Sequence, residues 1–220
     1  MNRNYQKEME KIIQEWGKES SHSGRKIPSL LLHSCCAPCS SYVLEYLSKH
    51  FAITVFFYNP NISIDKEYIL RKEEQKRLIE ALNLQREEAP PIRMIDGEYL
   101  PEEFYQIAKG LETCPEGGER CFACYKLRLR KAVEQAVVEG SDYVTTTLTI
   151  SPMKNAVKLN EIGEEAAKEF GAVWLPSDFK KKEGHKRSIE LSAIYGLYRQ
   201  DYCGCVYSKV ERQKEKENTK

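Results

Sequence analysis

The chain has 220 residues, of which 41% are hydrophobic and 30% charged, and its formal net charge is +1 at pH 7. This length allows one large domain with a substantial core. The near-zero charge excludes attraction of nucleic acid through the overall field of the protein, so any such binding must depend on local patches. No apolar run is long enough to cross a bilayer, and the charged N-terminus lacks the apolar segment of a secretory signal. We therefore expect a cytoplasmic protein with no membrane partner.

Strand and helix patterns alternate along most of the chain. Apolar residues at helical spacing predict an N-terminal helix over residues 1–20, followed by a flexible linker at 20–26. Strands are predicted at 27–33, 52–58, 143–150 and 172–175, and helices after Pro38 and at 67–84, 102–111, 120–139, 152–170 and 185–198. This order is typical of an α/β fold with a mostly parallel sheet, helices on both faces, and a metal site at the carboxyl edge of the strands.

The pattern divides the chain into three parts. Residues 1–26 are interpreted as a helical extension and linker, and residues 27–207 as one catalytic, metal-binding α/β domain. Residues 208–220 are a charged tail without apolar periodicity, for which we predict disorder.

Seven of the eight cysteines fall into three clusters, made of Cys35, Cys36 and Cys39, of Cys121 and Cys124, and of Cys203 and Cys205. Adjacent thiols cannot all turn into a core, and permanent disulfides are rare in a reducing cytosol. The clusters therefore indicate metal or redox chemistry. Cys114 stands alone and is interpreted as an ordinary thiol.

Cys36 with Cys39, and Cys121 with Cys124, form two C-x-x-C pairs that together offer four soft ligands. Tetrahedral sulfur coordination suits zinc or an iron–sulfur cluster, and the spacing does not choose between them. A closed zinc site that joins two loops is the structural alternative. Cys35 either points elsewhere or bridges a second metal. The helix N-terminus at Cys121 is expected to favour thiolate over thiol.

One glycine separates Cys203 from Cys205, so a disulfide between them would close a small, strained ring that is easily reduced. We interpret this pair as a redox relay, with cluster ligation as the alternative.

Polar residues near the predicted strand ends are weaker candidates, namely His33, Asn59, Asn61, Asp65, Tyr125 and Arg128. A structural histidine, turn asparagines and core-covering side chains explain them equally well. Two basic runs are also present, consisting of Arg120, Lys126, Arg128, Arg130 and Lys131, and of Lys180, Lys181, Lys182, Lys186 and Arg187. Such runs usually solvate helix faces, although the first lies beside a cysteine pair.

The segments HSCCAPCS, FFYNPNI, PEGGERCFACYKLRL and DYCGCVYS resemble, in order and approximate spacing, the signature segments of the epoxyqueuosine reductase family QueH. The resemblance covers residues 27–207. It implies an oxidoreductase of tRNA modification that reduces the epoxide of epoxyqueuosine at the tRNA wobble position to queuosine, independently of cobalamin. The basic runs would then bind tRNA phosphates.

The resemblance also implies a 4Fe-4S cluster and a neighbouring second iron. By position, the cluster ligands would be Cys35, Cys36, Cys121 and Cys124. Cys39, where the family can have a carboxylate, would bind the second metal. Cys203 and Cys205 would form a redox-active disulfide that passes reducing equivalents inward from an external donor, which the sequence does not identify.

Two functions of other classes remain as alternatives. One is a zinc-stabilised RNA-binding module without catalysis. The other is a thiol–disulfide oxidoreductase, whose activity would survive removal of metal.

Overall fold

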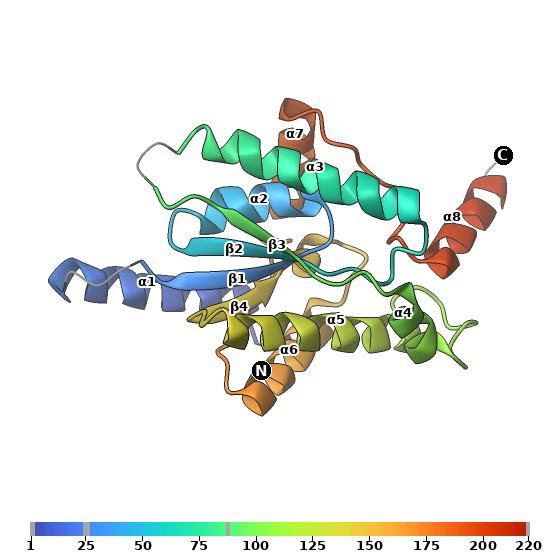
Figure 1. The fold of residues 1–220 in the computed structure, drawn as a ribbon, viewed down its shortest axis with the longest axis horizontal. Helices are drawn as coiled ribbons and strands as arrows, with labels where there is room; N and C mark the ends of the chain where they lie inside the picture. The colour runs from blue at the N-terminus through green and yellow to red at the C-terminus, as the bar shows by residue number, and fades with distance from the viewer. Residues whose placement is uncertain (1–2, 24–26, 87–88, 219–220) are drawn as a thin grey trace.

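The computed structural model describes residues 3–23, 27–86 and 89–218. Within these residues a parallel sheet has the strand order β3-β2-β1-β4. Its strands are β1 (Ser29–Ser34), β2 (Ala52–Phe57), β3 (Arg93–Asp96) and β4 (Tyr143–Thr146). Figure 1 shows this sheet between two layers of helices. The predicted α/β fold with a parallel sheet is therefore confirmed.

The two helix layers cover opposite faces of the sheet (Figure 1). One contains α2 (Ala37–Leu47), α3 (Asp65–Asn83) and α7 (Gly184–Ile194), and the other α4 (Pro101–Ala108), α5 (Glu119–Val138) and α6 (Ala156–Phe170). Successive side chains of a strand point to opposite faces. Accordingly, Leu30 and Leu32 pack with the first layer, and Leu31 packs with the second. Burial on both faces explains why β1 is a continuous apolar run.

The predicted N-terminal helix is present as α1 (Tyr5–Ser23), which extends into the segment expected to be a linker. Residues 24–26 of that segment lie outside the described residues. Met9 of α1 is fully buried in the core beneath α2 and α3, so the helix packs on the α/β unit. The division of the chain at residue 26 stays a prediction.

Three of the predicted elements between residues 143 and 175 differ in bounds or type. The strand expected over 143–150 ends at Thr146, whose side chain accepts from the amide of Leu148 and caps a 3-10 turn, η1 (Thr147–Ile150). The helix expected from 152 begins at Ala156, because Asn155 is its N-cap and accepts from the amide of Lys158. Residues 172–175 contribute a single bridge to β4 instead of a strand.

The charged tail, predicted to be disordered, forms α8 (Val206–Asn218). Glu211 accepts from the buried Arg120 at 3.2 Å, and the hydroxyl of Ser208 donates to Glu116 at 3.1 Å. The ring of Tyr207 lies beneath the Arg120 guanidinium, 4.6 Å from its central carbon. Polar contacts therefore hold this helix against the segment that precedes α5. A search for apolar periodicity does not detect a helix that is held by polar contacts.

No helix in the part of the chain that the structure describes is long and apolar enough to cross a membrane. The cellular compartment stays a prediction.

Candidate metal centre

The first cysteine cluster lies where β1 ends and α2 begins. Cys36 is the N-cap of α2, and a proline follows in its first turn, which fixes the direction in which the chain leaves the strand. The sulfur atoms of Cys35, Cys36 and Cys39 lie within 4.8 Å of one another, and those of Cys35 and Cys36 are 3.7 Å apart. Among the described residues this is the one such group of three or more potential ligands. The geometry suits a soft metal at the carboxyl edge of the sheet.

The other two cysteine clusters border the same region. Cys121 lies in the first turn of α5, and Cys124 in the second, where it packs in an apolar cluster with Cys205. Cys203 lines the same cleft as Cys35 and Cys39. Cys121 and Cys124 are not part of the close sulfur group among the described residues. The predicted four-cysteine ligand set therefore stays a prediction.

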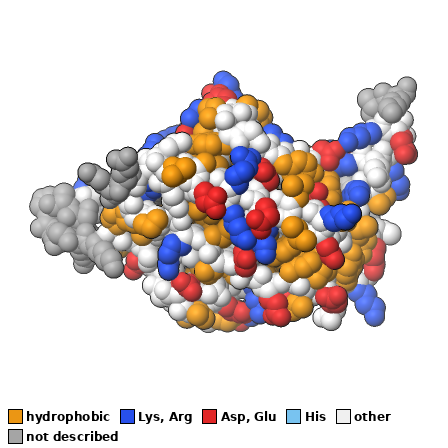
Figure 2. Space-filling view, turned by 45° about the horizontal axis from the view of Figure 1, so that its top comes forward, with side chains coloured by type: hydrophobic (Ala, Val, Ile, Leu, Met, Phe, Trp, Pro, Cys, Tyr) orange, Lys and Arg blue, Asp and Glu red, His pale blue; other side chains and the backbone are white. Residues whose placement is uncertain are grey.

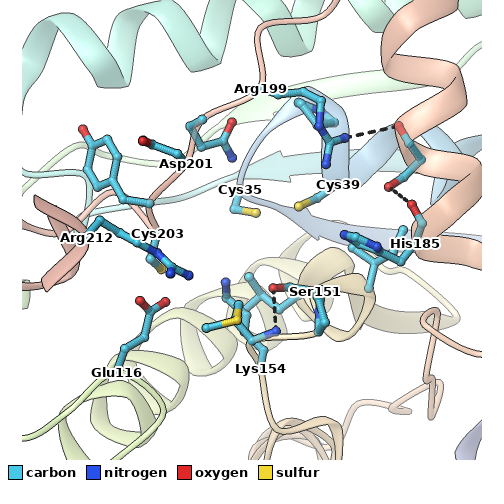
Figure 3. Close-up of a pocket in the computed structure, with 18 of the residues that line it drawn as sticks. Cys35, Cys39, Glu116, Ser151, Lys154, His185, Arg199, Asp201, Cys203 and Arg212 are labelled. Atoms are coloured by element: carbon cyan, nitrogen blue, oxygen red, sulfur yellow. Dashed lines mark hydrogen bonds between the residues drawn. The ribbon is translucent and has the colours of Figure 1, made fainter. Parts of the chain in front are cut away.

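A cleft of about 180 Å³ is lined by Cys35, Cys39 and Cys203. Figure 3 shows Cys35 and Cys39 directed into it, with Cys203 toward one end and His185 toward the other. Its polar lining includes Glu116, Lys154, His185, Arg199, Asp201 and Arg212. Thiols that line a polar cleft can react with, or bind a metal beside, a molecule held in that cleft.

The segment that contains Cys203 and Cys205 is fixed by Arg71, a buried residue of α3 that sequence reasoning missed. Its guanidinium donates to the carbonyl of Cys203 at 3.0 Å and pairs with Glu67 at 2.7 Å. The carbonyl of Gly204 accepts from the amide of Ser63 at 3.1 Å. These contacts attach the C-G-C segment to α3 and to the loop between β2 and α3, beside the cleft.

The thiols of the first cluster differ in pKa. Hydrogen bonds from Cys36 and Cys39 lower the pKa of Cys35, so this sulfur is the best placed to be a thiolate. The same contact with Cys35 raises the pKa of Cys36 to about 12. Nε2 of Gln200 donates to the sulfur of Cys36 at 2.9 Å. Bound metal would deprotonate its thiol ligands outright.

The expectation that the N-terminus of α5 favours thiolate is not met. Burial raises the pKa of Cys121, although the amide of Gly117 donates to its sulfur at 3.2 Å. Burial also raises the pKa of Cys124 to about 11 and that of Cys205 to about 12. Desolvation outweighs the helix terminus at these buried positions, so a nearby cation is needed to hold these sulfurs as thiolates.

Arg128 supplies a charge that fits a thiolate-bound metal centre. It is 1% exposed, and its Nη1 lies 4.0 Å from the sulfur of Cys124. Burial lowers the pKa of Arg128, but the negative charge that Cys124 and Cys35 carry as thiolates outweighs burial and raises it, so the guanidinium stays charged. Soft sulfur donors with a buried cation beside them suit an anionic metal or iron–sulfur centre.

His33 and Asn59 have structural roles. His33 is fully buried, its Nε2 donates to the carbonyl of Tyr58 at 3.1 Å, and its Nδ1 accepts from the hydroxyl of Thr146 at 2.9 Å. Burial, with Arg128 nearby, lowers the pKa of His33 to about 3 and keeps it neutral. Asn59 donates to the carbonyl at the end of β1, joining two neighbouring strand ends. Neither lines the cleft.

The remaining polar candidates also lie away from the cleft lining. Tyr125 is buried in the core beneath α5 and α6. Asn61 is buried, and Asp65 accepts from the hydroxyl of Tyr99 at 3.2 Å. Among these candidates Arg128 alone lines the cleft.

Four arginines of the two basic runs have partners within the protein, and phosphate binding by these runs stays a prediction. Arg120 and Arg128 are each 1% exposed and have partners inside the protein. Arg130 pairs with Glu169, and Arg187 pairs with a glutamate of α2 at 2.6 Å. On the face shown in Figure 2, basic side chains are interspersed with acidic ones. Of the cations that line the cleft, Arg128 belongs to a basic run, whereas Lys154, Arg199 and Arg212 stand apart in the sequence and so gave no signal.

Fold and site together define an α/β protein with a cysteine-rich candidate metal centre at the carboxyl edge of a parallel sheet. The family model described as "Epoxyqueuosine reductase QueH" matches residues 30–211. The chain therefore belongs to the epoxyqueuosine reductase QueH family, as its sequence segments predicted.

Several curated relatives carry the name epoxyqueuosine reductase QueH. The relative from Staphylococcus epidermidis is 40% identical over 211 residues, which cover 95% of this chain and 86% of the relative. The relative from Streptococcus pyogenes serotype M1 is 42% identical over 205 residues, covering 93% and 78%. A more distant relative from Thermotoga maritima is 32% identical over 191 residues, covering 84% and 92%. The similarity thus extends over nearly the whole chain.

Proposed function

We propose that this chain is an epoxyqueuosine reductase that acts on tRNA, removing the epoxide oxygen of epoxyqueuosine at the wobble position to give queuosine. The family assignment confirms the prediction of an oxidoreductase. The observation that carries the proposal is the group of Cys35, Cys36 and Cys39, whose sulfur atoms lie within 4.8 Å of one another and of which Cys35 and Cys39 line the cleft. Soft ligands beside a space for substrate suit a reductive iron–sulfur centre.

Conversion of an epoxide to an alkene consumes two electrons and two protons and releases the oxygen as water. A 4Fe-4S cluster with a neighbouring iron, bound without cobalamin, would supply the electrons and polarise the C–O bond. We propose Cys35, Cys36, Cys121 and Cys124 as the cluster ligands and Cys39 as a ligand of the second iron. The buried cation Arg128 and the soft sulfur donors support this choice of cofactor.

Cys203 and Cys205 are proposed to deliver electrons from an external donor. Both are free thiols in the structure, and Cys203 lines the cleft whereas Cys205 is buried beside Cys124. A Cys203→Ser variant should keep the iron and sulfide content of the wild type but stop after one turnover with the physiological or a dithiol donor. The control is Cys114→Ser, which should turn over normally. Normal steady-state activity of Cys203→Ser would exclude the relay.

Lys154, Arg199 and Arg212 give the cleft positive charge, which supports an RNA substrate. Neutralisation of phosphates releases counterions, so added salt should raise the KM for tRNA. Replacing Arg199 by Gln should raise the KM further and reduce its dependence on salt concentration. A KM that does not change with salt would count against phosphate binding at this cleft.

The cofactor is tested by anaerobic purification and measurement of iron, acid-labile sulfide and zinc per chain, with electron paramagnetic resonance after reduction. Iron in excess of sulfide, with a signal from a reducible cluster, is the expected result. Stoichiometric zinc without sulfide, persisting after attempted reconstitution, would instead favour the alternative in which the thiols hold a structural zinc ion.

A further inference from the structure

The fully buried arginines of the described residues differ in how their charges are compensated. Arg71 and Arg120 are each 1% exposed, and each has a carboxylate partner, at 2.7 Å and 3.2 Å respectively. Arg128 is equally buried, yet it takes part in no ion pair within the described part of the chain. Removing a charge from water costs several kcal/mol per ion unless an opposite charge compensates it. Arg71 and Arg120 already have this opposite charge, whereas Arg128 requires an anion from another source.

The contacts of Arg128 are neutral groups and thiols. Its Nη2 donates to the side-chain oxygen of Asn59 at 2.6 Å, and Nη1 lies 4.0 Å from the sulfur of Cys124. Nε is buried and has no hydrogen-bond partner among the described groups. Arg128 follows Cys124 by one helical turn of α5 and lines the cleft together with Cys35. Its charge thus faces two of the cysteine clusters at once.

We propose that Arg128 is the counter-ion of the anionic metal–thiolate centre and raises the reduction potential of that centre. The inference rests on the proposed function, because it takes the cysteines to hold an iron–sulfur cluster. A cluster gains one negative charge for each electron it accepts, so a fixed cation nearby stabilises the reduced state. Asn59 orients the guanidinium without cancelling its charge, whereas a carboxylate at this position would cancel it.

Two substitutions remove the effect in different ways. Arg128→Met removes the cation but keeps a long side chain, and Asn59→Asp keeps the arginine and gives it the carboxylate that Arg71 and Arg120 already have. After anaerobic reconstitution, each variant should show at least a tenfold decrease in the equilibrium constant for one-electron reduction of the cluster, or about 59 mV. The readout is potentiometric titration followed by electron paramagnetic resonance.

Two further variants serve as controls. Arg128→Lys keeps the charge and should restore most of the potential. Arg130→Met removes an arginine of the same helix whose side chain is 34% exposed and paired with Glu169, so the equilibrium constant should change less than threefold. If Arg128→Met does not fold, Asn59→Asp decides, because it keeps the arginine and the size of the side chain at position 59. It exchanges the amide, and with it the hydrogen bond to the carbonyl of Ser34, for a carboxylate.

The outcomes separate this inference from the proposed function. If the wild type binds a cluster and both Arg128→Met and Asn59→Asp keep its potential, the role of Arg128 is overturned and the proposed function stands. If the wild type binds no iron and sulfide on reconstitution, both fail. A lower potential in both variants, with the Arg130→Met potential unchanged, supports the inference.

Discussion

Replacement of Gly204 by alanine should displace the segment that carries Cys203 and Cys205. Gly204 has φ +121°, a backbone conformation that residues with side chains rarely adopt. An added Cβ would lie 2.9 Å from Cγ1 of Ile62 and 3.1 Å from Nη1 of Arg71. That nitrogen donates to the carbonyl of Cys203. The methyl group therefore strains the backbone and pushes against the side chain that fixes the segment.

The size of the effect follows from these two contributions. Backbone strain at such a φ costs roughly 1–3 kcal/mol, and insertion of a methyl into a filled space costs a similar amount. The free energy of unfolding should fall by roughly 2–6 kcal/mol, which lowers Tm by about 4–24 °C for a chain of this size. Gly196 is the matched control, because it has φ +58° and no atom within 4 Å of an added Cβ. Gly196→Ala should cost only about 1–2 kcal/mol.

The assay is thermal unfolding of both variants under reducing conditions, together with the alkylation rate of Cys203, identified by peptide mapping. Gly204→Ala should melt well below Gly196→Ala and should alter the alkylation rate of Cys203. Equal melting temperatures for the two variants, or unchanged alkylation, would refute the claim that Gly204 packs against Ile62 and Arg71.

Three further predictions concern packing, the C-terminal helix and the cofactor. A Cβ at Gly163 would lie 2.4 Å from the ring of Trp174, so Gly163→Ala should destabilise the fold by about 1–3 kcal/mol in urea unfolding, and an unchanged midpoint would contradict this packing. Glu211→Gln removes the charged partner of Arg120, so it should cost about 1–3 kcal/mol and speed amide exchange in α8. The control is Glu215→Gln, which removes the charge of an exposed ion pair with Arg212 and should leave amide exchange nearly unchanged. Equal acceleration in both variants would be evidence that the Glu211–Arg120 pair does not hold α8 in place. Reconstitution with iron and sulfide should raise Tm, since a group bound only by the native state stabilises it. The increase should be lost in Cys36→Ser, and an equal increase there would exclude Cys36 as a ligand.

Elements whose apolar faces are continuous could be predicted from the sequence. β1 and β2 are apolar runs buried on both faces, and α2 and α5 follow helical periodicity. β3 was missed because it is a short edge strand with exposed charged ends, Arg93 and Asp96.

The candidate site was predictable only in part. Cysteine spacing identified the thiol clusters, because neighbouring thiols signal chemistry without any knowledge of the fold. The roles of Arg71 and Arg128 depend on contacts between distant parts of the chain. Arg71 reaches a carbonyl 132 residues away, and Arg128 reaches an amide 69 residues away. In the sequence alone, Arg71 is one of many charges on a helix, and Arg128 belongs to a basic run that suggests an exposed surface.

The central claim is tested most directly by the nucleosides of tRNA that contains epoxyqueuosine, measured by mass spectrometry after incubation with anaerobically reconstituted protein and a chemical reductant. We predict conversion of epoxyqueuosine to queuosine, with loss of one oxygen atom, and no conversion by the Cys36→Ser variant. Epoxyqueuosine that remains unchanged in the presence of fully loaded, reduced wild-type protein would contradict the account.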